Sequence, residues 1–435
     1  MYRRSVLLTC LFVASLAVTG IETSRADIAV PASHAAPRTV LSKKRLANLE
    51  RVLQQYVDEE RIAGAVALVL QDGETVYEGA VGWRDKEAKR PMTPDTIFRI
   101  ASQSKAITSA AILQLVEDGS LALSNPVTQF IPEFAQAKAA VRDDDGTTRF
   151  VPLKRPIVIR DLLTHTSGYS YGREPHIEAL YAAKGLGPAA GNGWYTADKD
   201  EPICDTIARL GTLPTIAQPG EAYVYGYSTD ILGCIIERAS GLSLDAYLRT
   251  KIFEPLGMHD THFFLPKSKR ERLATVYASG PDGKVVRAPE GAKGQGHYVD
   301  GPRKSFSGGA GLLSTARDYA RFLEMIRNHG TLDGRRILGP RAVALMRTNQ
   351  IGTLHAADGG LGFGYGFQTV ERYGANGMDE VGAFGWGGAY GTIYRVDPAS
   401  GTTMVFMMQL MPNHTDIHEK VSALVYQALE EGSLR

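Results

Sequence analysis

The sequence predicts an α+β protein in which one antiparallel sheet, built from both ends of the chain and flanked by helices, lies beside a mainly helical lobe. Two observations predict this fold class. Residues 41–82 have the pattern of a helix followed by a β-hairpin, and residues 385–430 have the pattern of two strands followed by a helix. The residues between them are mostly patterned as short helices separated by glycine- and proline-rich loops.

The N-terminus has the pattern of a secretory signal peptide. Two arginines precede an apolar run from Val6 to Val18, and small and polar residues then lead to Ala26. The apolar run is shorter than the roughly 20 residues that span a bilayer. We therefore expect residues 1–26 to be removed on export to the periplasm or the medium. An uncleaved membrane anchor is the alternative, and a lipoprotein form through Cys10 fits the pattern poorly.

The rest of the chain is predicted to form one enzyme domain. Residues 27–40 are polar and rich in proline and alanine, and we expect them to be a disordered lead. The domain then covers 41–435. Within it, the sheet lobe is predicted to take about 41–100 and 300–435, and the helical lobe about 101–299.

The first segment of this domain has clear periodicity. Apolar positions recur at helical spacing from Leu41 to about Arg61. β-rich runs follow at 64–70 and 75–82, and the pair Asp72-Gly73 between them is typical of a hairpin turn. After a short loop, residues 101–119 suit a mostly buried helix with a glycine at its end.

Further helices are predicted in the middle of the chain. One runs from about Tyr227 to Ala239 and ends at Gly241. Ser243 is expected to cap the next helix, which ends near Pro255.

The last segment returns to strands. Gly385–Val396 and Thr402–Leu410 are β-rich runs, and Asp397–Gly401 between them has the composition of a turn. A helix from about Thr415 to Glu430 is expected to close the chain.

Charge and cysteine content exclude several classes of protein. The 48 basic and 47 acidic residues nearly cancel, which is not the pattern of a nucleic-acid-binding or anionic-membrane-binding protein. After export only Cys204 and Cys234 remain. They lack redox or metal-binding spacing, and one disulfide or two buried free thiols are both consistent with the sequence.

Ser102 and Lys105 are the first candidates for chemistry. They lie three residues apart at the start of a predicted helix, so they share one face. A serine at a helix N-terminus can attack a carbonyl while free N–H groups hold the developing oxyanion. For Lys105 to act as the base, its pKa must fall well below the ordinary value of about 10.4.

A second serine lies in a different motif. Gly168-Tyr169-Ser170-Tyr171-Gly172 matches G-x-S-x-G, which needs a strand before the serine and a helix after it. The segment before it, 159–166, is patterned as a helix, and Arg173-Glu174-Pro175 after it gives no helix start. Ser170 is therefore the weaker candidate nucleophile.

Five sequence blocks occur in an order that identifies a family. Together they resemble the β-lactamase-related serine hydrolases, which include class C β-lactamases, low-molecular-weight D,D-peptidases and, as the nearest group, family VIII carboxylesterases. The resemblance covers nearly all of the chain from Leu41 and implies the β-lactamase and penicillin-binding-protein fold. The blocks are FRIASQSKAITSAAILQLVEDG (98–119), IRDLLTHTSG (159–168), YGYSTDILG (225–233), GGAGLLSTARDYARF (308–322) and FGWGGAYGT (384–392).

The resemblance implies roles for individual residues. Ser102 matches the acylated nucleophile and Lys105 its partner. Tyr225 matches the tyrosine that relays protons between the serine and the leaving group. Tyr227 stands where β-lactamases and peptidases have asparagine, and it is the reserve candidate for the catalytic tyrosine.

The block Trp386-Gly387-Gly388 departs from the Lys-Thr-Gly of β-lactamases and matches the form that the esterases often carry. The resemblance implies that the next residue, Ala389, gives its N–H as the second oxyanion donor. Trp386 and Gly387 offer neither a cation nor a hydroxyl to a substrate carboxylate. We therefore expect neutral esters or hydrophobic acyl groups to be preferred over anionic β-lactams.

These residues predict an exported serine hydrolase that cleaves carboxylic esters through an acyl-enzyme on Ser102, with Lys105 and Tyr225 as proton-transfer partners. The expected partner is a small-molecule ester or acyl substrate. No cofactor, metal, nucleic acid or membrane span in the mature chain is implied, and the oligomeric state is not indicated. The alternatives are a D,D-peptidase, a β-lactamase or an acyltransferase on the same fold, and a non-catalytic binder of cell-wall peptides.

Overall fold

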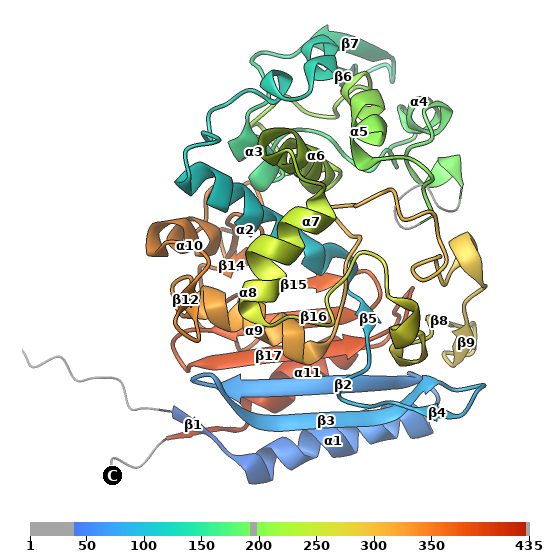
Figure 1. Cartoon of the computed structure of the whole chain (residues 1–435), viewed down its shortest axis with the longest axis vertical. Helices are drawn as coiled ribbons and strands as arrows, with labels where there is room; N and C mark the ends of the chain where they lie inside the picture. The colour runs from blue at the N-terminus through green and yellow to red at the C-terminus, as the bar shows by residue number, and fades with distance from the viewer. Residues whose placement is uncertain (1–38, 192–197, 432–435) are drawn as a thin grey trace, which may run out of the picture.

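The computed structural model describes residues 39–191 and 198–431, so the predicted signal peptide and most of the predicted lead lie outside it. An eight-stranded antiparallel sheet lies in the lower half of the molecule as drawn in Figure 1, with helices on both of its faces. Its strands, in spatial order, are β13 (Leu361–Phe363), β14 (Gln368–Val370), β15 (Phe384–Gly388), β16 (Thr392–Asp397), β17 (Thr402–Met408), β2 (Gly64–Gln71), β3 (Glu74–Asp85) and β4 (Arg90–Pro91).

The two ends of the chain meet in the middle of this sheet. β17 pairs with β2 over seven residue pairs, with Phe406 opposite Ala67. This confirms the predicted sheet built from both termini. Since side chains alternate along a strand, β2 is buried on both faces, with Leu68 facing one core and Ala67 the other.

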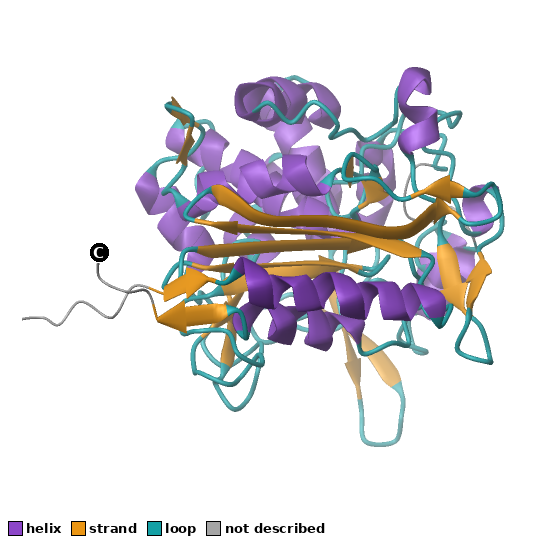
Figure 2. Cartoon of the chain, turned by 90° about the horizontal axis from the view of Figure 1, so that it is seen from below, coloured by secondary structure: helices purple, strands orange, loops and turns teal. Residues whose placement is uncertain are grey.

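Helices cover both faces of the sheet. On one face lie α1 (Lys43–Asp58) and α11 (Ile417–Tyr426), which share a core with alternate residues of β2. Figure 2 shows α1 lying across this face. On the other face lie α2 (Ser104–Glu117), α9 (Ala316–Arg327) and α10 (Pro340–Arg347), within the larger core.

The helical lobe packs on the far side of α2 (Figure 1). Its helices are α3 (Ile159–Leu163), α4 (Glu178–Ala183), α5 (Ile203–Gly211), α6 (Ser228–Ser240), α7 (Leu244–Leu248) and α8 (Glu254–Leu256), with a hairpin of β6 (Lys138–Arg142) and β7 (Thr148–Pro152). Gly241 ends α6 in the left-handed conformation, and the Ser243 hydroxyl accepts a hydrogen bond from the Ala246 N–H, both as predicted. Cys204 on α5 and Cys234 on α6 form a disulfide, which decides between the two states that the sequence left open.

Short strand pairs complete the fold. They are β5 (Phe98–Arg99) with β10 (Leu313–Ser314), β8 (Tyr277–Ser279) with β9 (Val285–Arg287), and β11 (Thr331–Leu332) with β12 (Arg335–Arg336). Within the described part of the chain, no helix is both long and apolar enough to cross a bilayer.

Two predictions at the C-terminal end are wrong in detail. Gly385–Val396 is not one strand, because the chain turns back at Ala389–Gly391 and forms the hairpin β15–β16. The last helix ends at Tyr426, before a short strand β18 (Leu429–Glu431). β18 pairs with β1 (Thr39–Leu41), so the end of the predicted disordered lead is a strand, anchored by the buried Leu41.

Candidate active site

Ser102 lies in a tight turn between a strand and a helix. The single 3₁₀ turn Ala101–Gln103 joins β5 to α2, and Ser102 is half-buried within it. Ala101 has a φ of +42°, a left-handed conformation that is costly for a residue with a Cβ. Strain of this kind persists where the surrounding structure holds it, and here it presents Ser102 at the N-terminal end of α2.

Lys105 lies directly beside Ser102 and donates three hydrogen bonds. Its Nζ is 2.7 Å from the Gly309 carbonyl oxygen, 3.1 Å from the Tyr171 hydroxyl and 3.5 Å from the Ser102 Oγ. The side chain is buried, with 2% of its surface exposed. The Gly309 carbonyl oxygen can only accept a hydrogen bond, whereas the two hydroxyls can donate or accept one.

A lysine that acts as a base must be neutral, but the surroundings of Lys105 favour its protonated form. Burial lowers the pKa of Lys105, but the neighbouring Tyr171, Tyr225 and Asp230 outweigh burial, and the pKa lies above its ordinary value. The lowered pKa that the sequence analysis required for a lysine base is therefore not found. Lys105 is a cation that can stabilise negative charge and hold its neighbours in place.

Gly309 accepts a hydrogen bond from Lys105, and the carboxylate of Asp230 lies near enough to raise its pKa. Sequence reasoning missed both residues. The buried Asp230 Oδ1 accepts hydrogen bonds from the Ser307 hydroxyl at 2.5 Å and from the Gly309 N–H at 3.1 Å. A Cβ at Gly309 would lie 2.5 Å from Asp230 Oδ2, so only glycine allows this approach. The signal was present in the two matched blocks that contain Asp230 and Gly309, but nothing in one sequence shows that they meet.

The structure brings Tyr225, and not Tyr227, to the Ser102–Lys105 pair. Lys105 Nζ lies 4.7 Å from the centre of the Tyr225 ring, and the Tyr225 hydroxyl accepts a hydrogen bond of 3.2 Å from the Trp386 indole N–H. The Tyr227 hydroxyl instead accepts a hydrogen bond of 2.9 Å from the Gly187 N–H. Tyr225 is therefore the better placed of the two candidates.

The G-x-S-x-G segment contributes a tyrosine rather than a nucleophile. The Ser170 hydroxyl donates to Glu174 Oε2 at 2.6 Å and accepts from the Gly172 N–H at 3.0 Å. No helix begins at Ser170, as the sequence predicted, so the G-x-S-x-G match lacks the helix that a nucleophile motif of this kind needs. The next residue, Tyr171, is the hydroxyl acceptor for Lys105, and sequence reasoning did not single it out.

The end of β15 lies beside the turn that carries Ser102. A Cβ at Gly388 would lie 2.4 Å from the Ile100 carbonyl oxygen, so glycine permits this close approach. No acceptor in the described chain bonds the Ala389 N–H, and Ala389 is exposed. The N–H that the resemblance assigned to the oxyanion therefore has no acceptor within the described chain.

Aromatic rings surround Tyr225 and Trp386. The ring of Phe363 lies 5.4 Å from Trp386, and the buried imidazole of His165 lies 4.8 Å from Tyr225. Burial, with the charge of Lys105 nearby, holds the pKa of His165 well below its usual range, so the imidazole is neutral. Phe363 and His165 are buried, so they pack behind Trp386 and Tyr225.

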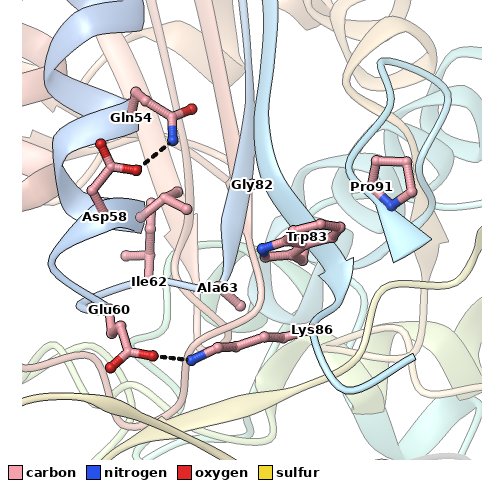
Figure 3. Close-up of a pocket in the computed structure, with 10 residues that line it drawn as sticks. Gln54, Asp58, Glu60, Ile62, Ala63, Gly82, Trp83, Lys86 and Pro91 are labelled. Atoms are coloured by element: carbon pink, nitrogen blue, oxygen red, sulfur yellow. Dashed lines mark hydrogen bonds and ion pairs between the residues drawn. The ribbon is translucent and has the colours of Figure 1, made fainter. Parts of the chain in front are cut away.

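A separate groove of about 450 Å³ lies between the end of α1 and the edge of the sheet (Figure 3). The residues predicted for the site do not line it, and we do not assign the chemistry to it. The groove is lined by Gln54, Val57, Asp58, Glu60, Ile62, Ala63, Gly82, Trp83, Lys86 and Pro91.

Comparisons with known proteins agree with this arrangement. A family model described as Beta-lactamase matches residues 49–427. The Esterase EstB of Burkholderia gladioli is 36% identical over 378 residues, which cover 83% of this chain and 89% of that protein. The Lovastatin esterase of Penicillium rubens is 32% identical over 318 residues, which cover 71% and 74%.

Solved structures give the same picture. EstCE1, described as a hydrolase with promiscuous acyltransferase activity, matches with a TM-score of 0.74 and 26% identity over 89% of this chain and 98% of that one. The octameric penicillin-binding protein homologue from Pyrococcus abyssi matches with a TM-score of 0.65 and 26% identity over 88% and 77%. The predicted fold is confirmed.

Proposed function

This chain belongs to the β-lactamase family and is a serine hydrolase, and we propose that it is an exported enzyme that cleaves small-molecule carboxylic esters through an acyl-enzyme on Ser102. Its esterase relatives support ester hydrolysis or acyl transfer as the reaction class. The observation that carries the proposal is the contact of Lys105 with both Ser102 and the ring of Tyr225.

The proposed mechanism gives each group one task. Tyr225 takes the Ser102 proton as the Oγ attacks the ester carbonyl. Tyr225 does so as a phenolate, and the Trp386 N–H and the nearby Lys105 ammonium stabilise its negative charge before the proton arrives. The N–H groups of Ser102 and Ala389 hold the oxyanion, and Tyr225 returns the proton to the leaving alcohol.

A second cycle completes the reaction. Water enters at the carbonyl of the acyl-enzyme, gives a proton to Tyr225, and releases the carboxylic acid while Ser102 is reprotonated. Oxygen and hydrogen balance over the two cycles as ester plus water to acid plus alcohol. Lys105 keeps its proton throughout, because its pKa is raised.

The wall of the site supports neutral substrates. Trp386, Gly387 and Gly388 leave a neutral surface beside the exposed Ala389. A carboxylate held against this surface would gain neither a cation nor a hydroxyl from Trp386 and Gly387 in place of the water that it loses. We therefore expect p-nitrophenyl butyrate to be turned over at least 100-fold faster than nitrocefin.

The test compares two serines in one protein. We expect Ser102→Ala to abolish hydrolysis of p-nitrophenyl butyrate and labelling by a fluorophosphonate, and the matched variant Ser170→Ala to retain both. Mass spectrometry of the labelled wild-type protein should place the adduct on Ser102. An adduct on Ser170, or full activity of Ser102→Ala, would refute the proposal.

Acyl transfer is the second candidate reaction, favoured by the acyltransferases among the relatives. Adding an alcohol acceptor to the ester assay and measuring the transesterified product separates the two reactions. Transfer that exceeds hydrolysis at millimolar acceptor would make the protein a transferase.

Export is part of the proposal and rests on the N-terminal pattern. Expression of the full chain in a bacterium should yield a protein in the periplasm or the medium whose first residue is near Asp27. An intact N-terminus on a cytoplasmic protein would contradict export.

A further inference from the structure

The Tyr227 hydroxyl bonds a group outside the proposed proton-transfer pair of Ser102 and Tyr225. Its side chain is buried, and its hydroxyl accepts the Gly187 N–H at 2.9 Å. Gly187 has a φ of +75°, and a Cβ there would lie 3.0 Å from the Tyr171 carbonyl oxygen. The turn at Gly187 therefore packs closely against the backbone of Tyr171. The hydrogen bond from the Gly187 N–H to the Tyr227 hydroxyl also holds this turn in place.

The ring of Tyr227 also packs against the ring of Tyr171. The two ring centres are 5.1 Å apart and the rings are inclined by 72°, an edge-to-face arrangement. The Tyr171 hydroxyl in turn accepts the hydrogen bond from Lys105. A continuous chain of contacts thus runs from Gly187 through Tyr227 and Tyr171 to Lys105.

We propose that Tyr227 is a positioning residue, whose ring and hydroxyl hold Tyr171 where it orients the Lys105 ammonium toward Ser102. This inference rests on the proposed function of the same site. It gives a task to the tyrosine that stands where the resemblance places asparagine in β-lactamases and peptidases.

The physical reason lies in the freedom of a lysine side chain. Ordering a lysine costs up to about 2 kcal/mol in rotamer entropy, so its terminal group needs fixed acceptors to keep one orientation. Gly309 and Tyr171 fix two of the three N–H directions, and the third then points at Ser102 Oγ. Gly309 is held by the hydrogen bond from its N–H to Asp230 Oδ1, whereas the Tyr171 ring is held by its packing, of which Tyr227 is a part.

Tyr227 itself does not exchange protons in this scheme. Burial raises the pKa of its phenol above the ordinary value, and its oxygen already accepts a backbone N–H. The titratable groups that act on Lys105 are Tyr171, Tyr225 and Asp230, with the neutral His165 nearby.

The test removes the ring and the hydroxyl of Tyr227 in separate variants. Tyr227→Leu removes both, and Tyr227→Phe removes only the bond to Gly187. We expect Tyr227→Leu to lower kcat for p-nitrophenyl butyrate at least tenfold with KM within threefold, and Tyr227→Phe to lower kcat about threefold. The contact with Tyr171 raises the pKa of Lys105, so its loss should move the alkaline limb of the pH–rate profile to lower pH.

A matched control separates positioning from general destabilisation. Tyr169 is also buried, and its hydroxyl donates to the Leu213 carbonyl oxygen at 3.3 Å, but its ring packs on Phe134. Tyr169→Leu should lower the melting temperature about as much as Tyr227→Leu, with kcat within threefold and an unmoved alkaline limb. Equal kinetic losses in the two variants would overturn the inference.

A double-mutant cycle with Tyr171→Phe tests the proposed path directly. If Tyr227 acts through Tyr171, the loss in Tyr171→Phe/Tyr227→Phe should be no larger than in Tyr171→Phe alone. Additive losses would overturn the inference, and this arm uses only conservative variants, so it holds even if Tyr227→Leu does not fold. A wild-type protein inactive on every ester would refute the proposed function instead. A crystal structure of Tyr227→Phe would then decide the inference by whether Tyr171 remains on Lys105.

Discussion

The indole N–H of Trp386 gives the sharpest test of the proposed mechanism. It donates a hydrogen bond of 3.2 Å to the Tyr225 oxygen, the atom that is proposed to carry negative charge before it takes the Ser102 proton. Trp386→Phe removes this donor and keeps an aromatic ring against Phe363 and Tyr225. The variant therefore separates the hydrogen bond from the apolar wall.

The expected loss follows from the charge on the acceptor. A hydrogen bond between neutral groups contributes about 1 kcal/mol, whereas one to a charged group contributes about 1.5–3 kcal/mol. Removing the donor therefore disfavours the phenolate that takes the Ser102 proton by about 0.5–2 kcal/mol relative to the phenol, which lowers kcat about 2- to 30-fold. KM should change little, because the bond does not involve the bound ester.

The assay is steady-state hydrolysis of p-nitrophenyl butyrate, with Trp83→Phe as the matched control. Trp83 lines the groove beside α1 and is partly exposed, so its replacement should leave kcat unchanged. A kcat for Trp386→Phe within twofold of wild type would show that the Tyr225 oxygen carries no negative charge when it takes the proton. A rise in KM alone would make Trp386 only a part of the substrate wall.

Three further predictions concern stability and the shape of the site. Replacing Cys204 and Cys234 by serine should lower the free energy of unfolding by about 3–4 kcal/mol in urea, from the loop-closure entropy of a 30-residue separation, and an unchanged midpoint would contradict this. Gly388→Ala should lower kcat at least 100-fold with an unchanged fold by circular dichroism, because its Cβ would meet the Ile100 carbonyl oxygen, and near-normal kcat would refute the tight contact. The Arg272 and Lys269 side chains outweigh burial and lower the pKa of Asp260 to about 2, so Asp260 stabilises the fold above pH 4 and this contribution is lost as the pH falls toward 2. The variant Asp260→Asn should therefore be about 1–2 kcal/mol less stable than wild type at pH 7 and nearly equal to it at pH 2, and a deficit that persists at pH 2 would contradict the charge argument.

The spacing of apolar residues along the chain predicted those helices and strands that bury one continuous face in the protein core. The helix after Leu41, the hairpin around Asp72-Gly73 and the helix ending at Gly241 all follow from apolar spacing and turn residues, and the structure has them. The turn Ala389–Gly391 was missed because it lies within a β-rich run and carries few turn residues. The pairing of β18 with β1 was missed because three-residue strands have too few positions to show a period.

Within the site, sequence could find residues that are near each other along the chain. Ser102 and Lys105 are separated by three positions, and helix geometry alone places them on one face. Tyr171 lies 66 positions from Lys105 and Gly309 lies 204 positions away, and their meeting depends on the packing of the whole helical lobe. The protonation of Lys105 could not be predicted for the same reason, since it depends on those distant neighbours.

The charge of Lys105 changes which residue must act as the base. A lysine whose pKa is raised keeps its proton, so the acceptor of the Ser102 proton must be another group near Ser102. The Tyr227 hydroxyl is bonded to Gly187. We propose Tyr225 as the acceptor, because the resemblance matches it to the proton-relay tyrosine and it has a cation beside its ring and an N–H donor on its oxygen. A Lys105→Arg variant should then keep more activity than Lys105→Met, because the cation and not the free amine is what the reaction needs. The reverse order would return the role of base to the lysine.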